Sequence, residues 1–294
     1  MFRFARLIAV LAVMLQAASA LAQTATRFPQ DYHGLWWNPA ESGWGLSVFD
    51  QGGVTLSSVL FVYGIDGNPT WYVAPNVSDC AVAFTPFLDV TCGGKIYQTN
   101  GPWFAGGPFN PSNVTVREVG DWSGDFAGPF AGGTPPRQVS LAVNIDGASF
   151  KRSGLMPQDI SGSASANYSQ VDSKYTDLWW NPDESGWGIG IFHYKATIFS
   201  VLFVYNATHQ PTWYVLSLNE STLTGDKTQR SFEGPVFVTH GSWWLTSPFK
   251  LSDVHSVGNA KIVFPSDGVN ASLSYTIDGN TVQTVIRRES SARP

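Results

Sequence analysis

Short runs in which apolar and polar residues alternate dominate the chain after residue 23, and this period of two is typical of half-buried β-strands. Trp44, Leu46 and Val48 are separated by single residues and predict one apolar face of a strand. Gly, Pro, Asn and Asp separate such runs, and the spacing of three and four residues that marks an amphipathic helix is missing from the sequence. The pattern predicts an all-β protein.

A near-verbatim internal repeat divides the chain into two units. Residues 35–45, LWWNPAESGWG, return at 178–188 as LWWNPDESGWG. Because a repeat of this kind marks a duplicated structural unit, we expect two tandem β domains. The sequence divides into a leader at 1–22, a first domain at 23–156, a linker at 157–174 rich in Ser, Ala, Gln and Asp, and a second domain at 175–294.

Each repeat is expected to fold as an antiparallel meander of roughly eight short strands. Asp-Gly dipeptides predict tight hairpins, because the turn residues must adopt positive φ. A small up-and-down β-barrel is the preferred architecture, since closure removes exposed strand edges; a β-sandwich or one composite sheet is the alternative. The dipeptides are Asp66-Gly67, Asp146-Gly147, Asp267-Gly268 and Asp278-Gly279.

Residues 59–63 are apolar on both faces of their predicted strand. Val59, Phe61 and Tyr63 lie on one face, and Leu60 and Val62 on the other. Only one of these faces can point into a barrel. We therefore expect the other face to pack against the sister repeat in a pseudo-twofold pair.

The N-terminus predicts an exported protein. Arg3 and Arg6 precede an apolar run over residues 7–15, and Ala20-Leu21-Ala22 fits a signal-peptidase site, with Ala18-Ser19-Ala20 as the alternative. The apolar run is too short to cross a bilayer comfortably, and no later run approaches that length, so we expect no membrane span. The expected location is the periplasm or the extracellular space.

Charge and cysteine content narrow the functional classes further. The formal net charge is −5 and there is no basic cluster, which argues against nucleic acid as a partner. The two cysteines, Cys80 and Cys92, are predicted to form a disulfide that closes a short loop.

The candidate binding site is centred on the repeated segments 35–45 and 178–188, which we call the signature. One interpretation is purely structural, with indoles in the core and Glu41 capping backbone donors. The other is a ligand site, because an indole face stacks on a ring while neighbouring polar groups fix its orientation. The candidate ligand-binding residues are Asn38, Glu41, Ser42, Trp44, Tyr63, Trp71, Asn181, Glu184, Ser185, Trp187, Tyr205 and Trp213, with Trp103 and Trp243 extending the surface.

Three functions remain open from these residues. The first is a binding protein with two aromatic-lined sites for glycans or another small ring-containing ligand. The second is a protein-interaction or protease-inhibitor module that uses the Gly/Pro-rich stretch 101–136. The third is a hydrolase that uses Glu41 and Glu184, with Asp121 or Asp125 as a conceivable partner of Glu41; the sequence assigns no catalytic residue, metal ligand or cofactor.

The signature also carries a family resemblance. The Trp-Trp-Asn-Pro-x-Glu-Ser-Gly-Trp-Gly motif resembles that of a largely uncharacterised family of secreted bacterial proteins with this duplication, over residues 32–156 and 175–289. More locally, Trp36-Trp37-Asn38 followed by Ser42-Gly43 is similar to the first strand of avidin and streptavidin, which implies an eight-stranded barrel with Asn38 and Ser42 at its open end. The inserted Pro39 and Glu41 depart from the avidin pattern, so biotin binding is not inferred.

Overall fold

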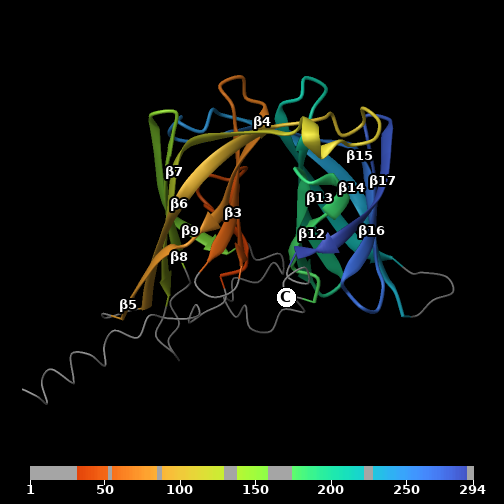
Figure 1. Cartoon of the computed structure of the whole chain (residues 1–294), viewed down its shortest axis with the longest axis horizontal. Coiled ribbons are helices and arrows are strands. Elements are labelled where there is room, and N and C mark those ends of the chain that lie inside the picture. The colour runs from red at the N-terminus through yellow and green to blue at the C-terminus, as the bar shows by residue number, and fades with distance from the viewer. Residues whose placement is uncertain are drawn as a thin grey trace, which may run out of the picture.

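The computed structural model describes residues 32–51, 55–84, 88–128, 138–157, 174–221 and 228–289. Each repeat forms an antiparallel β-meander, and the two stand side by side with their strands steeply inclined (Figure 1). This confirms the predicted pair of small up-and-down barrels over the sandwich or composite sheet. The predicted leader at 1–22 lies outside the described residues, as does the linker except Pro157 and Lys174.

The first barrel contains one strand more than the expected eight. A single pairing, Val73 with Tyr97, joins β4 to β6 and closes the ring. β5 is hydrogen-bonded to β6 alone and extends the sheet beyond the ring. The strands are β1 (Gly34–Trp37), β2 (Gly45–Asp50), β3 (Leu56–Tyr63), β4 (Pro69–Val77), β5 (Asp79–Phe84), β6 (Leu88–Asn100), β7 (Thr115–Gly128), β8 (Gln138–Ile145) and β9 (Ala148–Pro157).

The second barrel is closed by eight strands in chain order. Two short 3-10 helices, η1 (Pro111–Asn113) and η3 (Pro182–Glu184), lie in loops at the upper ends of the barrels. The strands are β10 (Asp177–Trp180), β11 (Gly188–Tyr194), β12 (Thr197–Tyr205), β13 (Pro211–Ser221), β14 (Arg230–Gly241), β15 (Leu251–Phe264), β16 (Asn270–Ile277) and β17 (Asn280–Arg288).

Two of the predicted Asp-Gly turns have positive φ at both residues. The φ angles are 50° and 81° at Asp146-Gly147, and 47° and 78° at Asp278-Gly279. These values match a two-residue turn whose twist suits an antiparallel hairpin. The turns join β8 to β9 and β16 to β17, so they mark equivalent positions in the two repeats.

Side chains at alternate strand positions fill the interior of each barrel. Trp36, Trp122 and Trp179 are almost completely buried there. The indoles of Trp36 and Trp179 donate hydrogen bonds to the carbonyl oxygens of Tyr32 and Tyr175, four residues earlier in each repeat. These two tryptophans act as core residues with a satisfied polar group, as buried indoles require.

The outer apolar faces of β3 and β12 pack against each other, as predicted from residues 59–63. The ring centroids of Phe61 and Phe203 lie 6.0 Å apart across this interface. Trp71 donates its indole N–H to the carbonyl oxygen of Val204 at 3.2 Å. Reciprocally, Trp213 donates to the carbonyl oxygen of Val62 at 3.1 Å, so the pseudo-twofold relation extends to individual hydrogen bonds.

The repeats also exchange loops at their upper ends. The β6–β7 loop leaves the first barrel and covers the upper end of the second (Figure 1, yellow). Its Phe104 N–H donates to the carbonyl oxygen of Tyr205 at 3.1 Å, and Trp244 of the β14–β15 loop donates to that of Tyr63 at 3.1 Å. The upper end of each barrel, which we call its mouth, is thus built from both repeats.

The predicted disulfide is confirmed. Cys80 and Cys92 face each other across the β5–β6 pair, with Cα atoms 4.1 Å apart. The bond lies outside the second repeat and away from both barrel mouths, where it reinforces the hairpin that extends the first sheet.

Within the described part of the chain, no helix has the length and apolar character needed to cross a bilayer.

Candidate functional site

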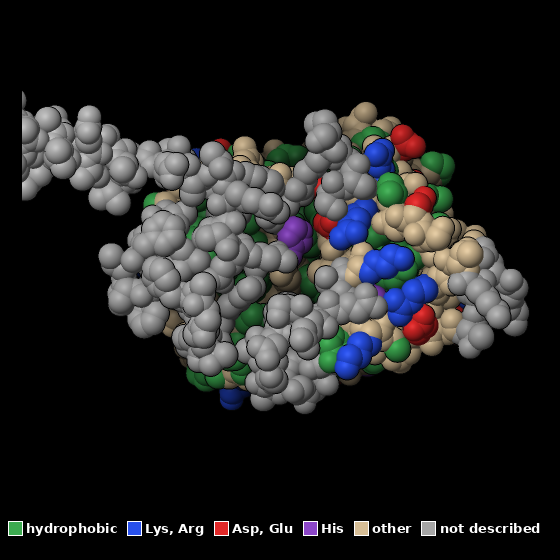
Figure 2. Space-filling view, turned by 90° about the horizontal axis from the view of Figure 1, so that it is seen from below, with side chains coloured by type: hydrophobic (Ala, Val, Ile, Leu, Met, Phe, Trp, Pro, Cys, Tyr) green, Lys and Arg blue, Asp and Glu red, His purple; other side chains and the backbone are tan. Residues whose placement is uncertain are grey.

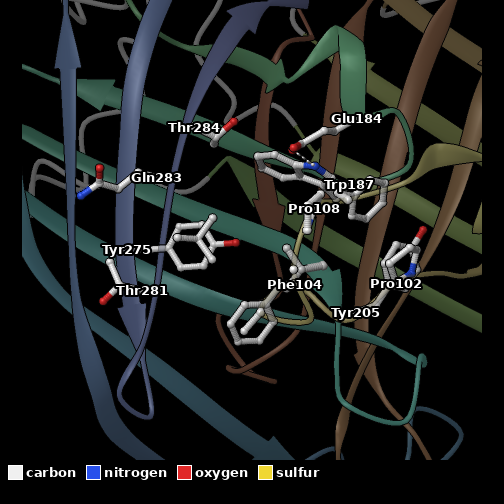
Figure 3. A pocket seen from close by; sticks show the side chains of 15 residues that line it. Pro102, Phe104, Pro108, Glu184, Trp187, Tyr205, Tyr275, Thr281, Gln283 and Thr284 are labelled. Atoms are coloured by element: carbon white, nitrogen blue, oxygen red, sulfur yellow. Dashed lines mark hydrogen bonds between the residues drawn. The ribbon is translucent and has the colours of Figure 1, made fainter.

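A cavity of about 330 Å³ opens at the upper end of the second barrel (Figure 3). Its volume lies at the lower end of the range for small-molecule pockets. The walls come from the β6–β7 loop of the first repeat, the signature loop between β10 and β11, and strands β12, β16 and β17. Its lining comprises Pro102, Phe104, Ala105, Gly107, Pro108, Phe109, Glu184, Trp187, Val204, Tyr205, Tyr275, Thr281, Val282, Gln283 and Thr284.

The loop from the first repeat supplies one aromatic wall. Phe104 lies with its ring centroid 6.0 Å from that of Tyr214 and 5.9 Å from that of Tyr275. Phe109 is stacked on Tyr205 at 6.5 Å. Because the main chain of Phe104 is hydrogen-bonded to Tyr205, this wall is held in place by both backbone and side-chain contacts.

The signature loop supplies the polar wall. Asn181 caps η3 by accepting the N–H of Asp183 at 3.0 Å, and its amide donates to Thr284 Oγ1 at 3.1 Å. Glu184 Oε2 accepts the indole N–H of Trp187 at 3.2 Å. Figure 3 shows this pair at the edge of the cavity opposite Tyr275, so one carboxylate and one indole face an aromatic floor.

Buried phenols stay protonated around the cavity. Burial raises the pKa of Tyr205, and the hydrogen bond to Thr99 lowers it. Burial has the larger effect, so the pKa rises to about 12. Burial raises the pKa of Tyr275 above its ordinary value, and the nearby Glu184 carboxylate raises it further. In Figure 3 the Tyr275 hydroxyl points toward the middle of the lining side chains. It is therefore a neutral hydrogen-bonding group at neutral pH.

The equivalent mouth of the first barrel is filled by side chains. Matching the two Asp-Gly turns places Phe150 opposite Val282 and Arg152 opposite Thr284. Phe150 lies between Trp44 and Trp244, with centroids 5.3 and 5.7 Å away. The guanidinium of Arg152 lies 4.5 Å above the Phe150 ring, so larger side chains occupy the space that is open in the second repeat.

Arg152 also changes the polar contacts of the first signature. Its Nε donates to Glu41 Oε2 at 2.7 Å, and a terminal nitrogen donates to the carbonyl oxygen of Thr246 at 3.2 Å. Glu41 therefore pairs with a cation where Glu184 accepts an indole N–H. The buried indole nitrogen of Trp44 has no hydrogen-bond partner among the described residues.

The structure divides the twelve candidate ligand residues into three groups. Glu184, Trp187 and Tyr205 line the cavity. Tyr63, Trp71 and Trp213 lie at the interface between barrels. The remaining candidates lie in the signature loops outside the cavity lining: Asn38 and Asn181 order backbone donors, Ser42 and Ser185 are exposed, Glu41 binds Arg152, and Trp44 packs on Phe150.

The tyrosine hydroxyls at the interface tie both repeats to a signature loop. Tyr63 donates to the carbonyl oxygen of Gly43 at 2.6 Å and lies 2.8 Å from Thr239 Oγ1. Tyr205 donates to the carbonyl oxygen of Gly186 at 2.5 Å and lies 3.0 Å from Thr99 Oγ1. Trp103 and Trp243, expected to extend the ligand surface, are half-buried beside Phe104 and Trp244 in the exchanged loops.

The conceivable acidic partners of Glu41 point away from it. Asp121 and Asp125 alternate with the buried Trp122 and Phe126 on β7, so they face outward. Asp121 pairs with Lys95 at 2.8 Å, and Asp125 accepts from Thr91. The two-carboxylate arrangement of a glycosidase is therefore not formed with these residues. The described residues also contain no cluster of three or more potential metal ligands.

The Gly/Pro-rich stretch 101–136 is not one irregular loop. Residues 101–114 cross to the second barrel, and β7 occupies residues 115–128. Residues 129–137 lie outside the described part of the chain. The crossing loop is held by the protein's own second repeat.

The lower end of the second barrel differs in character from its mouth. Tyr175 stacks on Phe264 at 3.9 Å, and His193 and Phe232 pack beside them. Lys and Arg side chains gather on this side of the face seen from below (Figure 2, right). Arg230 binds Glu220 and Arg288 binds Asp177, both within 2.9 Å, so aromatic rings and ion pairs close this end.

The cavity also contains residues that the sequence did not single out. Phe104, Tyr275 and Thr284 line it from segments remote from the signature. A signal for them exists in the repeat itself, since aligning the Asp-Gly turns shows Arg152 replaced by Thr284 and Phe150 replaced by Val282. Because the second repeat lacks the large ring and the cation at these matched positions, the alignment indicates that the cavity is in the second repeat.

No protein-family model, curated protein or solved structure matches the chain. The resemblance of the signature to a family of duplicated secreted proteins stays a prediction.

Proposed function

We propose that this is an exported binding protein whose ligand, a small ring-containing molecule, is held in the cavity of the second repeat. The observation that carries the proposal is a difference between matched mouths. Phe150 and Arg152 fill one, whereas Val282 and Thr284 leave about 330 Å³ in the other. The proposal therefore reduces the two expected sites to one.

The chemistry of the lining supports a flat or ring-shaped ligand. Phe104, Trp187 and Tyr275 supply aromatic surface, and Glu184, Gln283 and Thr284 supply polar groups at its edge. Aromatic walls with a few oriented polar groups are typical of small-molecule sites. A glycan ring or an aromatic compound fits this description.

Export is part of the proposal. The leader pattern at residues 1–22 and the Cys80–Cys92 disulfide both suit an oxidising compartment.

The test is a thermal-shift screen of the chain from Gln23 onward against monosaccharides, peptidoglycan fragments and aromatic metabolites. A ligand at about a hundred times its dissociation constant stabilises the fold by roughly 2.7 kcal/mol, which raises Tm by several degrees at this size. Binding should be confirmed by calorimetry, with an expected stoichiometry of one per chain.

Val282→Phe places in the second mouth the ring that fills the first, and should abolish binding without unfolding the protein. Val285→Phe is the matched control, because Val285 is on the same strand with 58% of its surface exposed. Binding that survives Val282→Phe, or a stoichiometry of two, would contradict the single site.

A further inference from the structure

Glu184 is the only charged side chain among the fifteen residues that line the cavity. It is half-buried, and its one hydrogen bond among the described side chains is the indole N–H of Trp187. An indole donor satisfies part of a carboxylate's hydrogen-bonding capacity but none of its charge. A carboxylate in an aromatic site is favoured by a nearby cation.

The first repeat shows what satisfies the same glutamate. Glu41 and Arg152 form an ion pair at 2.7 Å with side chains only 12% and 17% exposed. The guanidinium also lies over Phe150 and donates to a carbonyl oxygen of the exchanged loop. The first mouth therefore contains a carboxylate, an aromatic face and a guanidinium from the protein itself.

The second mouth has the carboxylate and the aromatic faces but no guanidinium among its lining residues. Glu184 supplies the carboxylate, and Phe104 and Trp187 supply aromatic faces. Thr284 stands where Arg152 supplies the cation, and its hydroxyl is bound by Asn181. The missing part is a cation with room for the group that carries it.

We propose that the ligand of the second mouth carries a guanidinium, amidinium or ammonium group that pairs with Glu184 as Arg152 pairs with Glu41. This inference rests on the proposed binding function and names the class of its ligand. Planar cations fit best, because they can donate to a carboxylate while stacking on an aromatic face.

Benzamidine, benzamide and benzoate test the inference, since they share one ring and differ in charge. Binding to the exported chain is measured by calorimetry and ligand-observed NMR. We expect benzamidine to bind about tenfold or more tightly than benzamide, the difference that a charge-assisted hydrogen bond makes. Benzoate should bind least. Absence of benzamidine binding, or equal affinity for benzamide, would overturn the inference.

Variants assign the selectivity to one carboxylate. Glu184→Gln keeps an oxygen for the Trp187 N–H and should remove the preference for benzamidine over benzamide when both are measured in this variant. Asp183→Asn removes the same charge from the adjacent, exposed position and should have no effect. Selectivity that survives Glu184→Gln would also overturn the inference.

Thr284→Arg supplies the internal cation found in the first repeat and should abolish benzamidine binding in the folded protein. Failure of the inference is distinguishable from failure of the binding function. If neutral ring compounds bind as tightly as benzamidine, and Val282→Phe abolishes their binding, only the inference of a cationic ligand is refuted. If no ring compound binds, both this inference and the proposed binding function are refuted.

Discussion

Trp71 and Trp213 are bound reciprocally across the interface: each donates its indole N–H to a carbonyl of the other barrel, at 3.2 and 3.1 Å. Both rings are buried, with 3% of their surface exposed. Replacing either with Phe removes the donor, reduces packing and should lower the free energy of unfolding by about 1–3 kcal/mol. Urea denaturation followed by circular dichroism measures the change. Trp37→Phe is the control, because that half-buried indole donates no hydrogen bond within the described residues.

The two barrels should unfold as one unit, although each has its own interior. Phe61 and Phe203 share one apolar cluster, and the exchanged loops place Phe104 and Trp244 on the opposite barrel. Separating the barrels would expose all of these surfaces to water, which is unfavourable. Calorimetry should therefore give one transition whose calorimetric and van't Hoff enthalpies agree. Two resolved transitions would show that the interface couples the repeats only weakly.

The disulfide should stabilise a limited part of the molecule. It links residues 12 apart within β5 and β6, and β5 pairs outside the ring. Closing a loop of about 15 residues stabilises by roughly 3 kcal/mol at most in the chain-entropy description. A Cys80→Ala, Cys92→Ala double variant should lose up to that amount in urea denaturation and show its largest loss of hydrogen-exchange protection in the β5–β6 hairpin. Reductant should lower Tm of the parent chain and leave that of the variant unchanged.

Much of the fold could be predicted from the sequence because the two faces of a strand follow from the alternation of neighbouring residues. Apolar residues on both sides of residues 59–63 implied two buried faces, and the repeat supplied the partner for the outer one. A different argument, that indole faces stack on ring-shaped ligands, placed Trp71 and Trp213 on a ligand surface. Local pattern shows that an indole is buried or shielded, but not whether a ligand or a sister barrel covers it.

The site was harder to predict because it depends on loop exchange. Phe104 contacts Tyr275, a residue distant in sequence, only because the β6–β7 loop crosses to the other barrel. No strand period encodes that crossing. The replacement of Arg152 by Thr284 is visible in the aligned repeats, yet its meaning requires knowing that both positions face a barrel mouth.

Alkaline pH should destabilise the protein through its buried phenols. Burial outweighs the hydrogen bond to Thr99 and brings the pKa of Tyr205 to about 12, and burial with the Asp278 charge raises that of Tyr214 to about 12. In the unfolded chain the tyrosine pKa is about 10. The unfolded state therefore releases protons first, and the contribution of these phenols to the free energy of unfolding should be constant below pH 10 and fall between pH 10 and 12. Urea midpoints across this range measure the fall. Tyr205→Phe should make it shallower, although the variant is less stable at pH 8.

Arg152 should be a stabilising residue, unlike Thr284. Arg152→Met removes the charge but keeps most of the side-chain volume, and leaves Glu41 without its cation at a position where only 12% of its side chain is exposed. Breaking a largely buried pair from one side is costly, and we expect a loss of about 2–4 kcal/mol in urea denaturation. Lys95→Met breaks an exposed pair with Asp121 and should leave the midpoint almost unchanged.

The same variant has a spectroscopic signature that a general loss of packing would not produce. Glu41, freed from Arg152, can accept the unpaired indole N–H of Trp44, as Glu184 accepts that of Trp187. The Trp44 indole N–H resonance in an NMR spectrum should therefore move toward that of Trp187 and exchange more slowly with solvent. A Trp44 resonance that does not move, in a protein that remains folded, would mean that the glutamate does not switch between the two partners and that the mouths differ by more than residues 152 and 284.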